Sequence, residues 1–400
     1  MTKNNIKKKV LMLSTSYPVV VGSVSGLFVS QLAMALSGKL NVSVLAPDAD
    51  SGHVLSPTSV ELNVFRYAPR ARQVLAHVPG GIPSQLKVNK FNYLLLPVFI
   101  ISYVFSSLRR AKSIDVVHAN WAFSAFAGWL VKKVFDVPLA TTLRGADVGL
   151  SGGGVSGALL RFSLWASDSV VVVSDEMLLH LKHQHPKYSK KYVAIHNGVS
   201  DLFSPKYKNP DFFPEKRLKL VYVGSLIARK NLSYVIHELS FIREQGVDFE
   251  LSIIGDGPGR KALVETVIRL GLEKHVCFLG ELSPERVADQ VNHAHVYVSS
   301  SLHEGRPNGV LEAMAAGCCC VLSDISGHRE LVGDGRGVIY SLDSSDELGR
   351  VLYGLDASRD CIAAMGQKSR QYIQDNSLTW DACAEAYAVL FDEMISRRNN

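Results

Sequence analysis

The run Val296-Tyr-Val-Ser299, followed shortly by Glu304-Gly-Arg-Pro-Asn-Gly-Val-Leu-Glu312, decides the fold. The first four residues have the β-branched and aromatic character of a short buried strand. The loop after them ends at Asn308, which is a favourable N-cap for a helix. The first turn of that helix would consist of Gly309, Val310, Leu311 and Glu312. A strand, a loop and a helix in this order are the repeating unit of a parallel sheet covered by helices.

The same alternation extends over most of the chain. Seven strand-like runs precede a pause in the pattern, at residues 10–13, 42–45, 60–67, 116–119, 139–143, 170–173 and 192–195. Six more follow it, at residues 218–223, 249–254, 276–279, 296–299, 320–322 and 338–340. Stretches of helical length separate them, among them residues 27–36, 122–135 and 157–166. The fold class is therefore predicted to be α/β, with parallel sheets covered by helices on both faces.

The pause lies between residues 197 and 214 and contains Pro205, Pro210 and Pro214, which is typical of a linker. A chain of 400 residues is also long for a single hydrophobic core. We therefore expect two Rossmann-like domains facing a cleft, residues 1–200 and 201–378, with ligands beyond the carboxyl ends of the strands. The final helix, residues 379–397, could cap the second domain or cross back to the first.

The composition narrows the classes of function. Hydrophobic residues make up 47% and charged residues 20%, as in a globular protein. The formal charge of +6 forms no basic run, so no nucleic-acid partner is expected. Asp48-Ala-Asp50 resembles a metal-binding DxD pattern but is interpreted as a solvated loop, and His180, His183 and His185 do not share a helix face. No Cys-x-x-Cys pair is present, and we expect no metal site and no cofactor.

Residues 304–312 are of the types that bind phosphate and sugar. The first turn of a helix presents backbone N–H groups at the positive end of the helix dipole, and Gly309 would let a diphosphate approach them closely. Glu312 could reach a sugar or ribose hydroxyl, and Glu304 could stabilise positive charge on a transferred sugar. Taken alone, Glu312 could equally be an acid that favours the helix dipole, and Glu304 a solvated loop residue.

The sequence that follows Glu304 and Glu312 resembles motifs of a known family. The run continues as Leu311-Glu-Ala-Met-Ala-Ala-Gly317, and His328-Arg-Glu-Leu-Val332 lies beyond the next strand. With two glutamates separated by seven residues, this resembles the retaining GT-B glycosyltransferases of family 4 (group 1), in particular bacterial polysaccharide-biosynthesis members. Further segments similar to family motifs are Tyr17-Pro18, Gly26-Leu-Phe-Val29, Asp115-Val-Val-His118, Ile195-His-Asn-Gly198, Val223-Gly-Ser-Leu226 and Ile254-Gly-Asp-Gly-Pro258. The resemblance runs through nearly the whole chain.

The resemblance implies a donor site in the second domain. Glu304 is implied to contact the donor sugar and Glu312 the donor ribose. The donor-binding set is implied to comprise Gly224, Ser225, Lys230, Glu304, Asn308, Gly309, Val310, Leu311 and Glu312. Lys230, with Arg229 before it, is suited to neutralising a leaving diphosphate. Family members commonly have arginine in place of Ser225, so Arg229 could supply the second cation.

The acceptor side is implied to lie in the first domain, with Gly26, His118, Arg144 and Asp147 as its candidate residues. His118 follows the strand to its carboxyl end and is either directed at the acceptor or a packed, hydrogen-bonded histidine. Family members commonly have histidine in place of Arg144, near the transferred sugar. Arg144 could bind an acidic sugar or acceptor, or could pair with Asp147. The candidate catalytic set is Glu304, Lys230, Arg229, His118 and Arg144.

The implied function is transfer of a hexosyl group from a nucleotide sugar to a glycan or lipid-linked acceptor, with retention of anomeric configuration and without a metal ion. The nucleotide sugar is a substrate, so no cofactor is implied. Two alternatives stay open because fold does not determine function. One is a nucleotide-sugar-binding subunit with little activity, which Ser225 and Arg144 suggest. The other is a nucleotide-sugar epimerase on the same fold.

Residues 91–108 carry no formal charge and reach the lower length limit of a membrane span, although proline and serines interrupt them. The flanking cations are Lys87, Lys90, Arg109 and Arg110. A membrane span, a buried helix and an interfacial helix with basic flanks are the three interpretations. The lysine-rich start of the chain lacks the apolar run of a signal peptide. We therefore expect a cytoplasmic protein, located at the inner face of the cell membrane if residues 91–110 contact anionic lipid.

Overall fold

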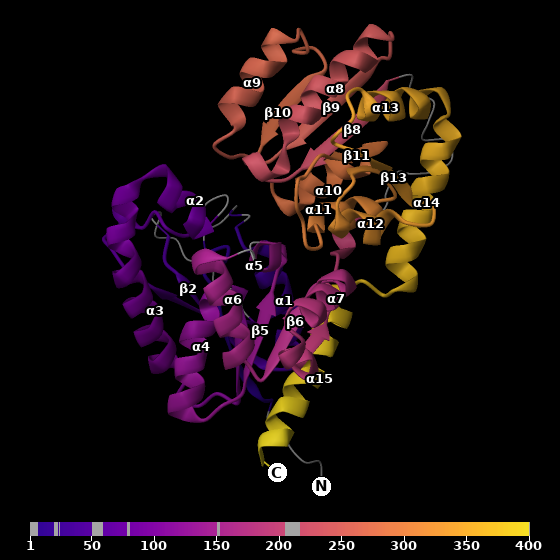
Figure 1. Ribbon diagram of the computed structural model, residues 1–400. Helices are drawn as coiled ribbons and strands as arrows, with labels where there is room; N and C mark the ends of the chain where they lie inside the picture. Colours follow the sequence, from indigo (N-terminus) through magenta and orange to yellow (C-terminus); the bar gives the residue numbers. More distant parts are fainter. Residues whose placement is uncertain are drawn as a thin grey trace. The chain divides into compact units, whose positions relative to one another are not determined.

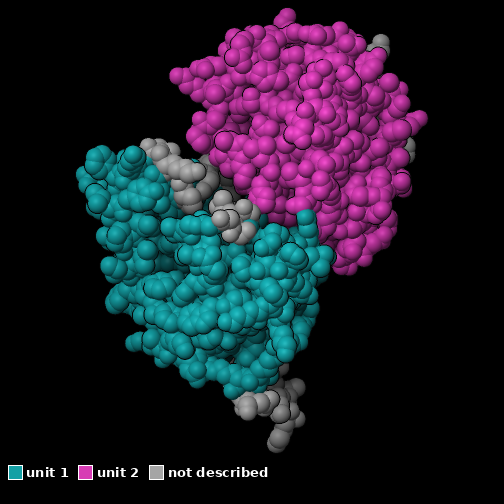
Figure 2. All heavy atoms as spheres, viewed as in Figure 1, with its two compact units in different colours: residues 1–198, 380–400 teal, residues 199–379 magenta. Residues whose placement is uncertain are grey.

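The computed structural model describes residues 7–19, 23, 25–49, 59–77, 81–149, 153–204 and 217–399. The chain divides into two compact units, which Figure 2 shows in different colours: residues 1–198 with 380–400, and residues 199–379. Each unit holds one parallel sheet with helices on its faces (Figure 1). The predicted α/β class, with two parallel sheets, is confirmed.

The sheet of the first unit has seven strands in the order β3-β2-β1-β4-β5-β6-β7. The strands are β1 (Lys9–Leu13), β2 (Asn41–Pro47), β3 (Glu61–Phe65), β4 (Val116–Asn120), β5 (Leu139–Leu143), β6 (Ser169–Val172) and β7 (Tyr192–Ala194). The helices are α1 (Leu27–Ser37), α2 (Gly81–Val88), α3 (Leu95–Arg110), α4 (Trp121–Phe135), α5 (Gly145–Gly149), α6 (Gly154–Ala166), α7 (Asp175–Gln184) and α15 (Trp380–Asn399). Short 3-10 helices are η1 (Arg70–Arg72), η2 (Lys90–Leu94) and η3 (Pro186–Lys191). Every strand predicted for this half is present, with small shifts at the ends.

The alternation of side chains along β1 explains how both faces of this sheet are covered. Val10 and Met12 belong to the core that includes residues of α1 and α15, whereas Leu11 and Leu13 belong to the core that includes residues of α3 and α4. Successive side chains of a strand point to opposite faces. A sheet buried on both sides therefore requires an uninterrupted apolar run, which the first strand has.

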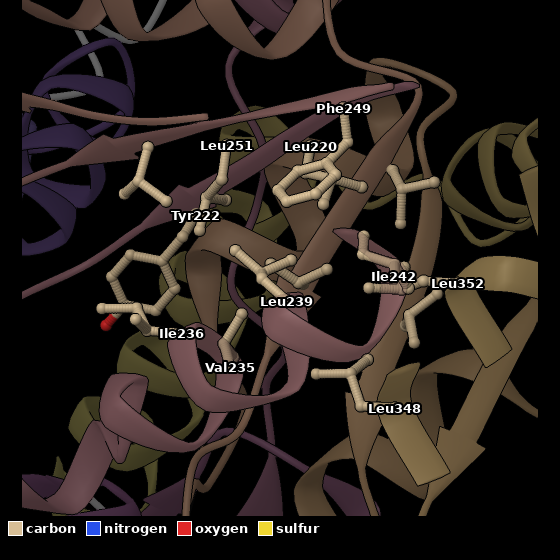
Figure 3. Close-up of a cluster of buried hydrophobic side chains, with 14 of the residues drawn as sticks. Leu220, Tyr222, Val235, Ile236, Leu239, Ile242, Phe249, Leu251, Leu348 and Leu352 are labelled. Atoms are coloured by element: carbon tan, nitrogen blue, oxygen red, sulfur yellow. The ribbon is translucent and has the colours of Figure 1, made fainter. Parts of the chain in front are cut away.

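The sheet of the second unit has six strands in the order β10-β9-β8-β11-β12-β13. The strands are β8 (Leu218–Val223), β9 (Phe249–Ile254), β10 (Val276–Gly280), β11 (Val296–Ser299), β12 (Cys319–Ser323) and β13 (Gly337–Tyr340). The helices are α8 (Leu232–Glu244), α9 (Arg260–Arg269), α10 (Pro284–Asn292), α11 (Asn308–Ala315), α12 (Ser326–Val332), α13 (Glu347–Ala357) and α14 (Arg359–Asp375), with η4 (Asp201–Phe203) and η6 (Ala228–Lys230). Figure 3 shows Val235, Leu239 and Ile242 of α8 against Leu220, Tyr222 and Leu251 of the sheet.

The predicted linker is partly a structural element. Val199 forms a bridge with Thr379, and Phe203 is buried in the core that contains residues of α10 and α11. Residues 199–204 therefore belong to the second unit and not to a free connection. The rest of the predicted linker, residues 205–214, lies outside the described residues. The final helix α15 packs on α1, with Tyr387 and Phe391 buried in the core of the first unit.

Residues 90–110 form η2 and α3, which lie along the edge of the first unit beside α4 (Figure 1). Phe99, Tyr103 and Ser107 on one face of α3 are buried, and the two aromatic rings pack against Phe65 of β3. The other face carries large apolar side chains that are exposed, namely Phe91, Leu94, Val98, Ile101 and Phe105. The interpretation as a wholly buried helix is therefore wrong. By length and composition alone, Lys90–Arg110 could cross a membrane.

Each sheet has one turning point in its strand order. β1 lies between β2 and β4, and β8 lies between β9 and β11. At such a point the loops from two neighbouring strands diverge to opposite sides, and ligands of parallel sheets bind beyond the carboxyl ends there. The segments after β8 and β11, and those after β1, β4 and β5, are therefore where a site is expected.

Candidate functional site

Two glycine-containing loops of the second unit pack directly on each other beside the turning point. Gly224 follows β8 and Gly255 follows β9. A Cβ added to Gly255 would lie 2.2 Å from the Gly224 carbonyl oxygen, and one added to Gly257 would lie 2.6 Å from the Leu226 carbonyl oxygen. Only glycine permits backbones to approach this closely. The two loops therefore fix the course of the chain from β8 into η6.

Glu304, in the loop after β11, contacts both cations of η6. Its Oε1 lies 2.6 Å from Nζ of Lys230, and its Oε2 lies 3.1 Å from Nη1 of Arg229. Arg229 also donates to the His303 carbonyl at 2.7 Å, and the Ser301 hydroxyl donates to Oε1 of Glu304 at 2.9 Å. Glu304 is only 9% exposed, so these partners replace water around its carboxylate. The structure thus brings three predicted catalytic residues together.

The charge of this cluster follows from its contacts. Burial alone would raise the pKa of Glu304, but Lys230 and Arg229 outweigh burial and lower the pKa to about 2. The carboxylate is therefore ionised at neutral pH. A ligand diphosphate that reached Lys230 and Arg229 would compete with Glu304 for the same N–H donors, so the cluster can exchange partners when an anion binds.

Helix α11 begins at Asn308, one residue earlier than predicted. Pro307 occupies the N-cap position, and no side chain caps the helix, so the predicted N-cap role of Asn308 is wrong. The N–H groups of Val310 and Leu311 donate to the Pro307 carbonyl at 3.2 and 3.3 Å, and both side chains are fully buried. Val310 and Leu311 therefore offer a ligand no side chain, and donation from the N–H groups of this first turn to a donor diphosphate stays a prediction.

Gly309 lies against the end of the sheet. A Cβ at this position would be 2.8 Å from the Tyr297 hydroxyl oxygen and 3.2 Å from the Val223 carbonyl oxygen. The Tyr297 hydroxyl donates to that carbonyl at 3.1 Å. Glycine is therefore required for packing α11 on β8 and β11. Its predicted purpose, close approach of a diphosphate, stays a prediction.

Glu312 lies in the same helix and is only partly buried. No described side chain or N–H group bonds to its carboxyl group, and burial raises its pKa to about 8. The two glutamates therefore differ in charge: Glu304 is ion-paired and ionised at neutral pH, whereas Glu312 is protonated and has no hydrogen-bond partner among the described residues. A ribose hydroxyl pair is a partner of suitable chemistry, because a protonated carboxyl group can donate one hydrogen bond and accept another.

Ser225 occupies a partly exposed position in the loop after β8. The Tyr222 hydroxyl donates to its carbonyl at 3.2 Å, which holds the loop but supplies no positive charge. Arg229, the predicted replacement for the arginine of other family members, is bonded to Glu304. The contacts of Arg229 with Glu304 and with the His303 carbonyl both use Nη1, so a diphosphate can take the other N–H donors of Arg229 or compete with Glu304 for Nη1.

Two further residues of this region were not among the predicted site residues. His328 of α12 is fully buried, and its Nδ1 donates to the Ser323 carbonyl at 2.9 Å, while Nε2 has no hydrogen-bond partner in the part of the chain that the structure describes. Burial lowers the pKa of His328 to about 4, so the ring is neutral and Nε2 is an acceptor. Arg306, also buried, pairs with Glu330 and ties the loop after β11 to α12. Both His328 and Glu330, the partner of Arg306, lie in the run 328–332, which resembles a family motif.

In the first unit, His118 is a packed histidine. It is fully buried, Nε2 lies 2.8 Å from the Thr142 hydroxyl, and its ring contacts Tyr387 and Phe391 of α15. Burial and the charge of Arg144 lower its pKa to about 3. The structure thus shows His118 as a packed, hydrogen-bonded histidine, and its role toward an acceptor stays a prediction.

Among the described residues, the direct contact between Arg144 and Asp147 is a main-chain hydrogen bond, and their side-chain charges interact without forming an ion pair. The Asp147 carboxylate accepts from the N–H groups of Arg144 at 2.8 Å and of Ala122 at 3.0 Å. Burial raises the pKa of Asp147 to about 6. The guanidinium of Arg144 instead donates to Asn197 and lies over the ring of Phe28. The predicted Arg144–Asp147 side-chain pair is therefore wrong.

Gly26 precedes α1 with a φ of 71°, and a Cβ there would lie 2.3 Å from the Ser16 carbonyl oxygen. The position therefore requires glycine, because the loop after β1 folds onto it. Gly26 and Arg144 are both on the described edge of this sheet where an acceptor is expected.

The acidic and histidine motifs considered as metal sites differ in their surroundings. Asp48 is buried, and its carboxylate pairs with Nε of Arg66 at 2.6 Å, so its reading as a solvated loop residue is wrong. Asp50 lies outside the described residues. His180 and His183 are exposed on α7, as expected of a surface cluster.

Two family models match the chain, one to each unit. The model described as glycosyl transferases group 1 matches residues 203–370, and the one described as glycosyltransferase family 4 matches residues 27–201. Among curated relatives, N-acetyl-alpha-D-glucosaminyl L-malate synthase of Bacillus anthracis is 22% identical over 327 residues, which cover 79% of this chain and 85% of the relative. Alpha-maltose-1-phosphate synthase of Mycolicibacterium smegmatis is 25% identical over 368 residues, covering 84% and 86%.

Solved structures with a similar fold span nearly the whole chain. Sucrose-phosphate synthase from Thermosynechococcus elongatus has a TM-score of 0.78 at 19% identity, covering 98% of this chain and 100% of that one. Anabaena Alr3699/HepE in complex with UDP-glucose has a TM-score of 0.75 at 16% identity, covering 96% and 99%. At these identities the likeness establishes the fold.

Proposed function

The chain belongs to the family 4 (group 1) glycosyltransferases and has their GT-B fold, and from this premise we propose that it transfers a hexosyl group from a nucleotide sugar to a glycan or lipid-linked acceptor in polysaccharide biosynthesis. The second unit is proposed to bind the donor and the first unit the acceptor. UDP and UDP-glucose, which are bound in the Alr3699/HepE structures, are the first donor ligands to test.

The observation that supports this proposal best is the contact of Glu304 with Lys230 and Arg229 at the turning point of the second sheet. Arg229 and Glu304 are 75 residues apart in sequence. A subunit that only binds nucleotide sugars gains affinity from the two cations but loses some of it to a buried, ionised acid between them. A transferase can use all three, because positive charge develops on the sugar while negative charge develops on the leaving diphosphate.

In the proposed reaction, the bond between C1 of the sugar and the diphosphate oxygen breaks, and the acceptor oxygen bonds to C1 on the same face. Lys230 and the start of α11 stabilise the departing diphosphate, and Glu304 stabilises the positive charge at C1. The leaving phosphate takes the proton of the acceptor hydroxyl. No metal ion takes part, and the configuration at C1 is retained.

A panel of nucleotide sugars screened by thermal unfolding tests donor binding, because a bound ligand stabilises the folded state by mass action. The donor found in this way is then incubated with short glycan and lipid-linked acceptors, and the anomeric configuration of the product is read by NMR. A retained anomer is expected. An inverted anomer refutes the mechanism, and tight donor binding without transfer to any acceptor favours the binding subunit.

We also propose that the exposed face of η2 and α3 lies on an anionic membrane surface. Phe91, Leu94, Ile101 and Phe105 are each 66% to 78% exposed, whereas the opposite face packs on the sheet. A helix with one face packed on its own domain is not surrounded by lipid, which favours an interfacial position over a span. The neighbouring helices α4 and α6 contribute an aromatic cluster in which Trp165 is 52% exposed.

The charges around this face suit anionic lipid. No Asp or Glu occurs between Glu61 and Asp115, while Lys90, Arg109 and Arg110 flank the apolar stretch. Each cation near an anionic surface contributes about 1 kcal/mol to membrane binding. A peripheral position of this kind, on the cytoplasmic side, would bring the chain to lipid-linked acceptors.

Flotation with vesicles tests the membrane proposal. The double variant Ile101→Ser, Phe105→Ser is expected to reduce binding to phosphatidylglycerol vesicles about tenfold or more, since each residue loses much of its transfer free energy. Leu179→Ser, which removes an equally exposed side chain from α7, is the matched control and should bind as the wild type does. Equal binding of neutral and anionic vesicles, or wild-type flotation of the double variant, contradicts the proposal.

A further inference from the structure

The first unit contains a buried cation, Arg144, whose guanidinium forms no ion pair with any described acid. Arg144 follows β5 and is 9% exposed. Its Nη1 donates to Oδ1 of Asn197 at 3.2 Å, while Nε and Nη2 have no hydrogen-bond partner among the residues that the structure describes. The Asp147 carboxylate is already used by backbone N–H groups. Leaving buried N–H donors without acceptors costs free energy, so acceptors for Nε and Nη2 of Arg144 would stabilise this site.

Asn120 presents a second unsatisfied polar group at the same edge of the sheet. It is the last residue of β4 and is fully buried, and within the described ranges neither Oδ1 nor Nδ2 has a partner. The register of β4 and β5 pairs Asn120 with Thr142. Because side chains alternate along a strand, Asn120 lies on the same face as Thr142 and as Arg144, two residues beyond it.

Two aromatic rings adjoin these polar groups. The guanidinium carbon of Arg144 lies 3.9 Å from the centre of the Phe28 ring, and the Trp121 ring meets Phe28 edge-on with centroids 5.7 Å apart. Trp121 has a φ of 67°, a left-handed conformation that is costly for a bulky side chain. Backbone strain of this kind persists at ligand sites, where the surrounding structure enforces it.

We propose that Arg144 and Asn120 bind an oxyanion carried by a substrate of the first unit, either the carboxylate of an acidic sugar or the phosphate of a lipid-linked one. This inference rests on the proposed function and specifies its substrate class. Nε and Nη2 of a guanidinium match two oxygens of a carboxylate or phosphate. The Asn120 amide can donate a third hydrogen bond, and the rings of Phe28 and Trp121 can pack on the apolar face of a sugar.

A purely structural Arg144 has different consequences. Its hydrogen bond to Asn197 and its contact with Phe28 would then be the whole compensation for its loss of hydration. A neutral side chain of similar length would in that case fold as well or better. If Arg144 binds substrate, removal of its charge should weaken anion binding without weakening folding. Measurements of anion affinity and of stability on the same variants therefore separate the two roles.

Calorimetric titration and thermal unfolding of the full chain with four probes test the proposal. Methyl glucuronide carries a carboxylate on a sugar and geranyl phosphate carries a phosphate on a lipid chain. Methyl glucoside and geraniol are their neutral counterparts. The variants are Arg144→Gln, Arg144→Lys and Asn120→Ala, with Arg161→Gln, an exposed cation on α6, as the charge-matched control. UDP is titrated in parallel to report on the second unit.

One anionic probe is expected to bind at least about tenfold more tightly than its neutral counterpart, and its identity names the source of the oxyanion. Arg144→Gln should lower that affinity about tenfold to a hundredfold, which corresponds to the loss of charged hydrogen bonds. Arg144→Lys, which keeps the charge without the fork, should lose less. Arg161→Gln should bind the probe as the wild type does, and UDP affinity should be unchanged in every variant.

Equal affinity for anionic and neutral probes would overturn the proposal, and so would undiminished anion binding by Arg144→Gln. If Arg144→Gln does not fold, Asn120→Ala provides the same comparison, and unchanged anion affinity in that variant counts against the site. Failure of UDP to bind the wild-type chain would instead count against the proposed function, because UDP is assigned to the second unit.

Discussion

Replacing Glu304 by glutamine removes the charge of the buried acid while keeping its size. The variant retains an acceptor for the Ser301 hydroxyl but loses the ion pairs with Lys230 and Arg229. These two cations would then lie beside each other without a counter-ion. We expect both the stability of the second unit and the rate of transfer to fall.

The size of the stability effect follows from the pKa of Glu304. Against burial, Lys230 and Arg229 lower it from 4.5 to about 2. One pKa unit corresponds to about 1.36 kcal/mol, so ionisation contributes about 3 kcal/mol at neutral pH. Because the folded pKa lies below the unfolded one, this contribution is present above the unfolded pKa and is lost as the pH falls through the folded pKa. At about pH 3.5, about 1.4 kcal/mol of it has been lost.

Hydrogen exchange of peptides from β8 and β9 measures this effect in the second unit alone, since local opening is resolved along the chain. The free energy of opening is compared between wild type and Glu304→Gln at pH 7 and at about pH 3.5. The difference should shrink by about 1.4 kcal/mol at the lower pH. Glu250→Gln is the matched control, because Glu250 pairs with Arg217 at 3.1 Å with both side chains 41% exposed. That variant should change stability by about 0.5 kcal/mol or less.

Two results would refute this reasoning about Glu304. A stability difference that is the same at both pH values would mean that the charge of Glu304 is not responsible. In transfer assays, kcat of Glu304→Gln should fall about a hundredfold to a thousandfold, while UDP binds as tightly as before or more tightly because the cations are no longer neutralised. Weaker UDP binding with unchanged kcat would assign Glu304 to ground-state binding.

Three further predictions concern the same unit. Burial raises the pKa of Glu312 from 4.5 to about 8 in the folded chain. The free energy of unfolding therefore falls as the pH rises from 4.5 to about 8, because the unfolded state releases the proton first. Glu312→Gln should unfold at a higher temperature than wild type at pH 8 but not at pH 5. The same variant should bind UDP more weakly, and equal unfolding temperatures at pH 8 would contradict the assigned burial. Gly309→Ala should destabilise the chain by about 1–3 kcal/mol in denaturant unfolding, because its Cβ would displace the Tyr297 hydroxyl. Gly354→Ala, whose Cβ meets nothing within 4 Å in α13, should be neutral or stabilising, and equal effects of the two alanines would exclude the packing argument. Chelation of divalent cations by EDTA should change the rate of transfer by no more than about twofold. Loss of activity on chelation, restored by Mg²⁺ or Mn²⁺, would contradict the proposed metal-independent mechanism.

The positions of the strands could be predicted because a strand that is buried on both faces of a parallel sheet needs apolar residues at consecutive positions. Each such strand is an apolar, β-branched run, and the loops between are polar or rich in glycine. The donor segment could be predicted for a similar reason, since Glu304 and Glu312 lie within nine consecutive residues that share one loop and one helix. Exposure could not be predicted for residues 90–110, because an apolar composition does not say which side of a helix meets the protein.

What the sequence determined by itself was therefore the order of elements, the two sheets and the segment that carries the two glutamates. Only the tertiary structure decided which distant residues meet: Glu304 with Arg229 and Lys230, His118 with α15, and the Arg144 guanidinium with Phe28 and Asn197. Such contacts depend on strand order and on which side of each sheet a helix crosses. A local pattern records whether a side chain is buried, but the identity of its partner is set by parts of the chain that approach only when the sheet has assembled.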